Sequence, residues 1–189
     1  LPTTAAGGFR ITAAQLEAAI TPATRWLLLN SPGNPTGATY PAEELRALGE
    51  VLRRHPRVLV MSDDIYAPLN YSNEPHATLA NLCPDLATRI CTVSGVSKSH
   101  AMTGFRIGVS AGPLWLISAM ARLQSHSSGN AASISQAAAV AAFAKAPQAI
   151  AKSPGPRGEV ADTFSMKGFA AAYAAAIMIA GFGLIELRF

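Results

Sequence analysis

The sequence has few charged residues and only two cysteines. Charged residues make up 14% of the 189 positions and hydrophobic residues 50%, which predicts a buried core and excludes a disordered chain. Cys83 and Cys91 do not form a C-x-x-C pair, and the four histidines lack metal-ligand spacing, so neither a zinc site nor a disulfide framework is indicated. A reducing compartment, the cytoplasm, is therefore expected.

Several sequence fingerprints are also missing. Neither G-x-G-x-x-G nor G-x-x-x-x-G-K-[ST] occurs, so the usual dinucleotide and nucleotide sites are not indicated. Basic residues are scattered at a net charge of +4, and no nucleic-acid surface is predicted. The chain begins with leucine and has no signal-peptide pattern, and we expect it to be a fragment of a longer protein.

One hydrolase-like motif is present and is rejected on its context. The segment 108–112 reads G-V-S-A-G and matches G-x-S-x-G, with Ser110 at the nucleophile position. An α/β-hydrolase needs an acid and then a histidine after the serine. Only His126 follows Ser110, and all later acidic residues come after His126, so the required order fails.

Apolar runs alternate with helical patterns along the first 145 residues. The patterns predict strands at 24–30, 57–61, 88–93 and 107–111, and helices at 11–20, 41–55, around 79–82, 113–125 and 133–144. The first strand is continuous in apolar residues and is expected to be buried on both faces. In the helix at 113–125, Leu116, Met120 and Leu123 are expected to point inward. The order predicts an α/β fold, a three-layer sandwich with a mostly parallel sheet.

Three polar residues each follow a predicted strand. Asn34 lies in the Pro/Gly-rich loop 30–37, Asp63 follows the second strand, and Lys98 lies in a Gly/Ser-rich loop after the third. Ligands bind at the carboxyl ends of strands in open α/β sheets, so the three are expected to converge on one edge. A lysine in such a place is a candidate amine for condensation with a carbonyl group. Tyr66, three residues after Asp63, is expected on the same side.

These segments carry a family resemblance. N-S-P-G-N-P-T-G (30–37), D-D-I-Y (63–66) and S-G-V-S-K-S-H-A-M-T-G-F-R-I-G (94–108), in this order, resemble the class I/II, fold-type I aminotransferases, which use pyridoxal 5'-phosphate (PLP). The flanking sequence is most similar to the bacterial aspartate aminotransferase subgroup, which includes aspartate/prephenate enzymes. The resemblance covers about residues 8–143 and implies part of the PLP-binding large domain.

The resemblance implies a role for each residue at the strand ends. Lys98 would form a Schiff base with the cofactor aldehyde and then move the proton between the substrate Cα and the cofactor. Asp63 would pair with the protonated pyridine nitrogen and keep the ring cationic. Tyr66 and Asn34 would hydrogen-bond the phenolate oxygen of the cofactor ring.

The cofactor phosphate is expected at the other end of the lysine segment. Arg106 would hold it in a charge-assisted pair, aided by a serine hydroxyl from Ser94 or Ser97. The choice of serine is open, because Gly95 stands three residues before the lysine, where relatives often have serine. Phe105 stands where relatives commonly have tryptophan.

The composition of the last 43 residues, 147–189, differs from that of the rest of the chain. We expect residues 1–146 to be the partial PLP-binding domain and 147–189 to be an atypical tail. The tail contains a breaker cluster at 152–158 and an uncharged run at 168–185. The run is compatible with a membrane span, a buried helix or sequence foreign to the family.

The resemblance implies transamination between an aspartate-like amino acid and a 2-oxo acid in a cytoplasmic homodimer, with no nucleic-acid partner and no membrane. The fragment alone is expected to be catalytically poor, because the arginine that binds the substrate carboxylate lies outside it. Two alternatives are a PLP-binding segment of a non-catalytic regulator and an inactive truncated remnant. The amino acid used as substrate is not encoded in these residues.

Overall fold

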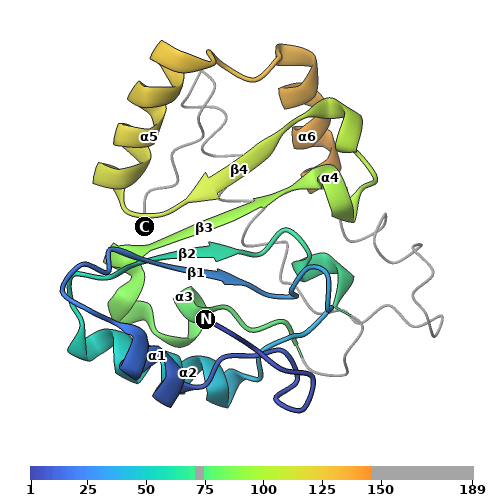
Figure 1. Ribbon diagram of the computed structural model, residues 1–189. Helices are drawn as coiled ribbons and strands as arrows, with labels where there is room; N and C mark the ends of the chain where they lie inside the picture. The colour runs from blue at the N-terminus through green and yellow to red at the C-terminus, as the bar shows by residue number, and fades with distance from the viewer. Residues whose placement is uncertain (71–74, 146–189) are drawn as a thin grey trace.

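The computed structural model describes residues 1–70 and 75–145, which form a four-stranded sheet with helices on both faces (Figure 1). The strands are β1 (Trp26–Asn30), β2 (Leu59–Asp63), β3 (Ile90–Gly95) and β4 (Gly108–Ala111), in the order β1-β2-β3-β4. β1, β2 and β3 are parallel, and β4 is antiparallel to β3. The predicted α/β class with a mostly parallel sheet is confirmed.

One face of the sheet is covered by α1 (Ala13–Ala19), α2 (Ala42–Arg54) and α3 (Leu79–Leu82) (Figure 1). Thr12 caps α1 with a complete capping box. α2 has glutamates in its first turn and arginines in its last, which complements the helix dipole. Its predicted apolar stripe is buried against the strands and includes Leu45, Leu48, Val51 and Leu52.

The opposite face carries α5 (Leu114–Ser127) and α6 (Ser133–Ala144) (Figure 1). Leu116 and Ile117 of α5 pack on Cys91 of β3. Ala139 and Phe143 of α6 pack near α4 (Val96–Ser99), the single helical turn that follows β3. Three short 3₁₀ segments complete the described elements: η1 (Ala67–Leu69), η2 (Pro84–Arg89) and η3 (Thr103–Phe105).

Two burial predictions are wrong. β1 buries Leu27 and Leu29, but its other side chains face outward, with Trp26 36% and Leu28 69% exposed. β1 lies at the edge of the described sheet while α5 packs over β3, so the described helices do not cover this side of the edge strand. Leu123 is 72% exposed, because the inward face of α5 is formed in its first two turns, by Leu116, Ile117 and Met120.

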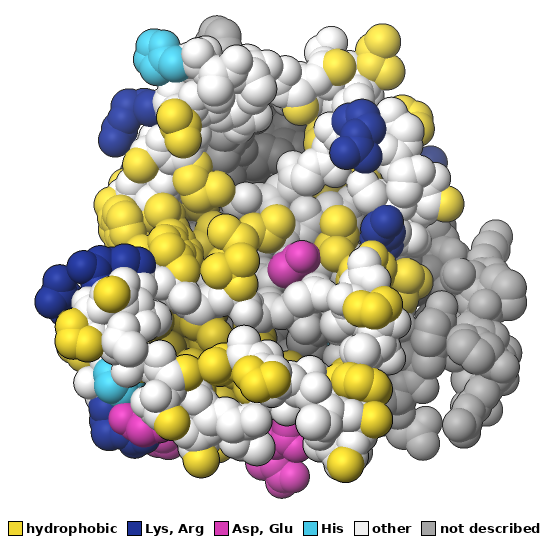
Figure 2. All heavy atoms as spheres, in the orientation of Figure 1, with side chains coloured by type: hydrophobic (Ala, Val, Ile, Leu, Met, Phe, Trp, Pro, Cys, Tyr) yellow, Lys and Arg dark blue, Asp and Glu magenta, His cyan; other side chains and the backbone are white. Residues whose placement is uncertain are grey.

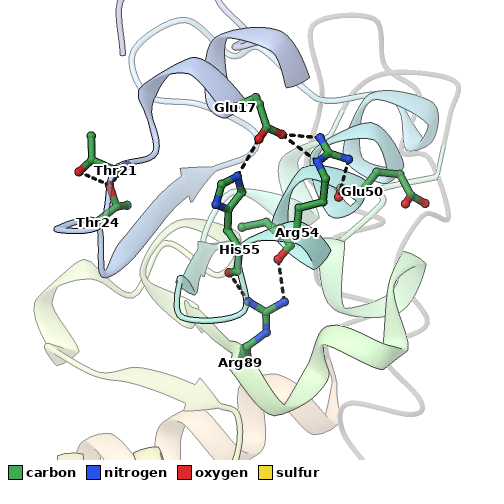
Figure 3. A network of polar contacts seen from close by, with 8 residues as sticks. Glu17, Thr21, Thr24, Glu50, Arg54, His55 and Arg89 are labelled. Atoms are coloured by element: carbon green, nitrogen blue, oxygen red, sulfur yellow. Dashed lines mark hydrogen bonds and ion pairs between the residues drawn. The ribbon is translucent and has the colours of Figure 1, made fainter.

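Polar contacts fasten the end of α2 to its neighbours (Figure 3). Glu17 of α1 binds the side chains of Arg54 and His55. The guanidinium of Arg89, just before β3, donates hydrogen bonds of 2.9–3.0 Å to the carbonyls of Leu52, His55 and Val58. These carbonyls are at and beyond the helix end, where intrahelical donors run out. The Leu52 and His55 carbonyls each accept one backbone N–H as well, so Arg89 adds a charged donor to them.

Within the described ranges, no helix is long and apolar enough to cross a membrane. The predicted tail at 147–189 and its uncharged run at 168–185 lie outside the described residues. Both cysteines are buried free thiols.

Candidate functional site at the carboxyl ends of the strands

The three parallel strands end at one edge of the sheet, and the predicted residues follow those ends (Figure 1). Asn30 of β1 is in register with Asp63 of β2, and Asp63 is in register with Val93 of β3. The loop with Asn34 follows β1, Tyr66 follows β2, and Lys98 lies in α4 directly after β3. The parallel topology thus carries these side chains to the same edge, as expected from the sequence.

Asn34 and Lys98 both lie next to Tyr66. The Asn34 amide donates a hydrogen bond of 3.2 Å to the Tyr66 hydroxyl. The Lys98 Nζ lies 5.9 Å from the centre of the Tyr66 ring, within the range of a cation–π interaction. An amide, a phenol and a primary amine from three separate segments therefore form one cluster.

The two adjacent carboxylates after β2 lie in different environments. Asp63 is partly exposed, and its Oδ1 accepts the Ile65 backbone N–H at 3.2 Å. Asp64 is 5% exposed and accepts a 2.8 Å hydrogen bond from the Ser62 hydroxyl. Burial raises the pKa of the Asp64 carboxyl to about 6. Asp63 is therefore the carboxylate available at the carboxyl end of β2, and Asp64 is buried in the core.

Lys98 lies in a helical turn and not in an irregular loop, which corrects the sequence-based expectation. The turn begins directly after the buried Gly95, which is extended at φ 170°. A Cβ atom on this glycine would lie only 3.1 Å from the Ile107 carbonyl oxygen. A side chain at this position would therefore need the β4 backbone to move by a few tenths of an ångström. The first turn after the strand exposes Lys98 on the same side as Tyr66.

The three residues predicted to bind the phosphate are near Lys98 in sequence, but in the part of the chain that the structure describes they make no hydrogen bond to the cluster. Arg106 is exposed, has a left-handed backbone (φ 50°), and donates to the Thr103 carbonyl at 3.0 Å. Ser94 pairs with Val109 across the β3–β4 ladder, and Ser97 lies in α4. Among the described residues, no hydrogen bond links these three to Asn34, Asp63 or Tyr66.

A pocket of about 390 Å³ adjoins the cluster. It lies between the loop after β1 and the η1 segment, and its lining residues include Asn34, Pro35, Thr39, Tyr66 and Leu69. Lys98 is not one of the lining residues; its amine lies over the ring of Tyr66, which lines the pocket together with Asn34. Thr39 and Leu69 were not predicted as lining residues, because no motif distinguishes them from ordinary loop residues.

Figure 2 shows hydrophobic side chains gathered around the start of α5. The exposed side chains there include Leu114 and Trp115, and β1 exposes Leu28. The start of α5 lies toward the amino ends of the parallel strands, away from the cluster (Figure 1).

The rejected motif residue Ser110 lies inside β4, paired with Val93, and not at a strand-to-helix turn, which supports its exclusion as a nucleophile.

Comparisons with known proteins agree with the motifs. The family model described as Aminotransferase class I and II matches residues 1–162. An aspartate aminotransferase of Rhizobium meliloti (strain 1021) is 55% identical over 139 residues, which is 74% of this chain and 34% of that protein. A probable aspartate/prephenate aminotransferase of Rickettsia bellii is 53% identical over 135 residues, 71% of this chain and 34% of that protein.

Solved structures give the same result. The aspartate aminotransferase of Rhizobium meliloti superposes with a TM-score of 0.73 at 44% identity, over 94% of this chain and 40% of that one. That of Thermus thermophilus (a double mutant) superposes at 0.72 and 32% identity, over 94% of this chain and 42% of that one. The chain spans about a third of the length of the curated relatives that it matches.

Proposed function

Because the chain belongs to the aminotransferase class I and II family, we propose that it is the cofactor-binding part of a PLP-dependent transaminase. The reaction is amino-group transfer between an aspartate-like amino acid and a 2-oxo acid, in line with the names of its relatives. A homodimeric parent enzyme in the cytoplasm belongs to the same proposal. The observation that carries it is the contact of Lys98 and Asn34 with Tyr66 at the carboxyl ends of the strands.

The side chains at the site offer a matching group for each functional group of the cofactor. PLP presents an aldehyde, a phenolate oxygen, a pyridine nitrogen and a phosphate, and when bound it supplies an electron sink for the substrate Cα. Lys98 offers the amine for the aldehyde, and Asn34 and Tyr66 offer hydrogen-bond donors for the phenolate oxygen. Asp63 offers a carboxylate for the ring nitrogen, and Arg106 offers an exposed cation for the phosphate.

Each protein group has a separate task in this proposal. Lys98 would hold the cofactor through its amine, and after the substrate amine had displaced it, the Lys98 amine would carry a proton to and from the substrate Cα. Asp63 keeps the ring nitrogen protonated through a charge-assisted hydrogen bond. Asn34 orients the Tyr66 hydroxyl, so the two donors act as one unit. Arg106, with Ser94 or Ser97, would hold the phosphate and so limit rotation of the ring.

The test is absorbance spectroscopy of the purified chain with PLP. We expect a visible band from the Lys98–cofactor bond that disappears in Lys98→Ala. Lys145→Ala is the matched control, since Lys145 lies at the end of α6, and it should keep the band. Borohydride reduction and peptide mapping should then find the cofactor on Lys98. An equal band in both variants would show that the assignment of Lys98 is wrong.

A further inference from the structure

Asn30 is the last residue of β1, and both the oxygen and the nitrogen of its side-chain amide are hydrogen-bonded to segments of the proposed site. Its Oδ1 accepts the backbone N–H of Asn34 at 2.9 Å. Its Nδ2 donates to the backbone carbonyl of Asp63, also at 2.9 Å. Both distances are those of well-formed N–H···O hydrogen bonds. Asn30 is therefore a cross-link between the Asn34 loop and the end of β2.

The loop itself is internally braced, so one external link can set its position. Gly33 N–H bonds the Ala38 carbonyl at 2.8 Å, and Gly37 N–H bonds the Gly33 carbonyl at 2.7 Å. Besides Asn30, the Ser31 N–H approaches the Asp63 carbonyl at a longer 3.3 Å. The Nδ2 of Asn30 thus makes the shorter of these two bonds to the Asp63 carbonyl, and its Oδ1 extends the link into the loop at Asn34.

We propose that Asn30 is a positioning residue that holds the Asn34 amide in line with Tyr66, and so sets the hydrogen bonding of the cofactor oxygen next to Lys98. The chain of contacts runs from the Asp63 carbonyl through the Asn30 amide to the Asn34 backbone, and from the Asn34 side chain to the Tyr66 hydroxyl. This inference rests on the proposed PLP function. It goes beyond it by assigning a role to a residue that reaches the site only through others.

The first test needs no cofactor. In the full chain, hydrogen exchange of the Asn34 amide, followed by NMR, should accelerate about tenfold or more in Asn30→Ala, because its acceptor is lost. Asn30→Asp keeps the acceptor oxygen and should retain the protection. Asn130→Ala, an exposed loop variant, is the control for general loosening and should leave the rate unchanged. Unchanged exchange in Asn30→Ala would overturn the cross-link.

The second test reads the site spectroscopically. The pH midpoint of the Lys98–cofactor band should rise by about 0.5–1 unit in Asn30→Ala, the size expected for one lost hydrogen bond. The midpoint rises because a phenolate oxygen with fewer donors binds the shared proton more tightly. Asn34→Ala should give a similar shift, and the double variant should shift no further, because both changes remove the same interaction.

The outcomes separate the two hypotheses. A band with an unmoved midpoint in Asn30→Ala, or shifts that add in the double variant, would overturn the role of Asn30 and leave the proposed function intact. Absence of any Lys98-dependent band in the unsubstituted chain would overturn the proposed function and the positioning role together. Accelerated exchange with non-additive midpoint shifts would support both.

Discussion

Gly49, in the middle of α2, gives a prediction in which two physical effects oppose each other. The residue is buried, and a Cβ atom built on it would lie 2.5 Å from the Sγ of Cys83. Favourable contacts between such atoms begin at about 3.5 Å. Replacing glycine by alanine within a helix normally stabilises by about 1 kcal/mol. Forcing a methyl group into a filled core normally costs about 1–3 kcal/mol.

We expect the steric cost to exceed the gain in helix propensity. Gly49→Ala should therefore lower the free energy of unfolding by up to about 2 kcal/mol. Cys83 is 1% exposed, so its sulfur has little space into which to move. In a Cys83→Ala background the clash is gone, and the same Gly49→Ala change should stabilise by about 1 kcal/mol. The sign of the effect thus reverses with the identity of residue 83.

Urea denaturation followed by circular dichroism measures the four free energies of this double-mutant cycle. Ala47→Gly on the exposed side of the same helix calibrates the propensity effect and should cost about 1 kcal/mol. If Gly49→Ala stabilised the chain with Cys83 present, the packing argument at this position would be wrong. A coupling energy near zero would refute it equally.

Two further predictions concern stability. Arg89→Met should lower the free energy of unfolding by roughly 1–3 kcal/mol, because three carbonyls at and beyond the end of α2 lose a charged donor, although those of Leu52 and His55 keep a backbone N–H. Thermal or urea unfolding checks this. Arg25→Met, which loses only local exposed contacts, should change the free energy by less than about 0.5 kcal/mol. Burial raises the pKa of Asp64 to about 6 and lowers that of His76 to about 4. Between about pH 4 and 6 the folded state holds a proton on Asp64 that the unfolded chain releases, so stability falls as pH rises; His76 acts in reverse, since only the unfolded chain is protonated there. In His76→Gln the free energy of unfolding should therefore fall by about 3 kcal/mol from about pH 4 to pH 6, and in Asp64→Asn it should rise by about the same amount. The same pH dependence in both variants would contradict the assignment.

The sequence predicted the regular elements well where periodicity was strong. The buried stripe of α2 followed from the spacing of its apolar residues, and the structure buries those residues. The bounds of α6 followed from its alanine-rich composition. Periodicity was less informative for α5, where Leu123 fits the helical pattern but lies beyond the turns that reach the sheet. It also gave no signal for α4, because four residues are too few to show a period.

The site was predicted in part for a similar reason. Asn34, Tyr66 and Lys98 were recognisable because their residue types stand directly after apolar strands, and the topology brings them into contact. Asn30 was not, because a terminal strand asparagine has no distinctive spacing, and its two hydrogen bonds depend on the parallel register with Asp63. Whether Arg106 reaches the site depends on the side-chain positions of an exposed loop, which motif spacing does not determine.

The antiparallel pairing of Gly95 with Gly108 has a consequence for the segment between them. Paired Cα atoms in such a ladder lie about 5 Å apart, so both ends of this segment are fixed to each other. Lys98 is three residues from one end and Arg106 two from the other, which limits their separation to roughly 20 Å at full extension. A small anionic ligand bound by either cation therefore meets the other at an effective concentration on the order of millimolar or more. Changes in β1 or β2 shift Asn34 and Asp63 relative to this pair without altering the tether itself.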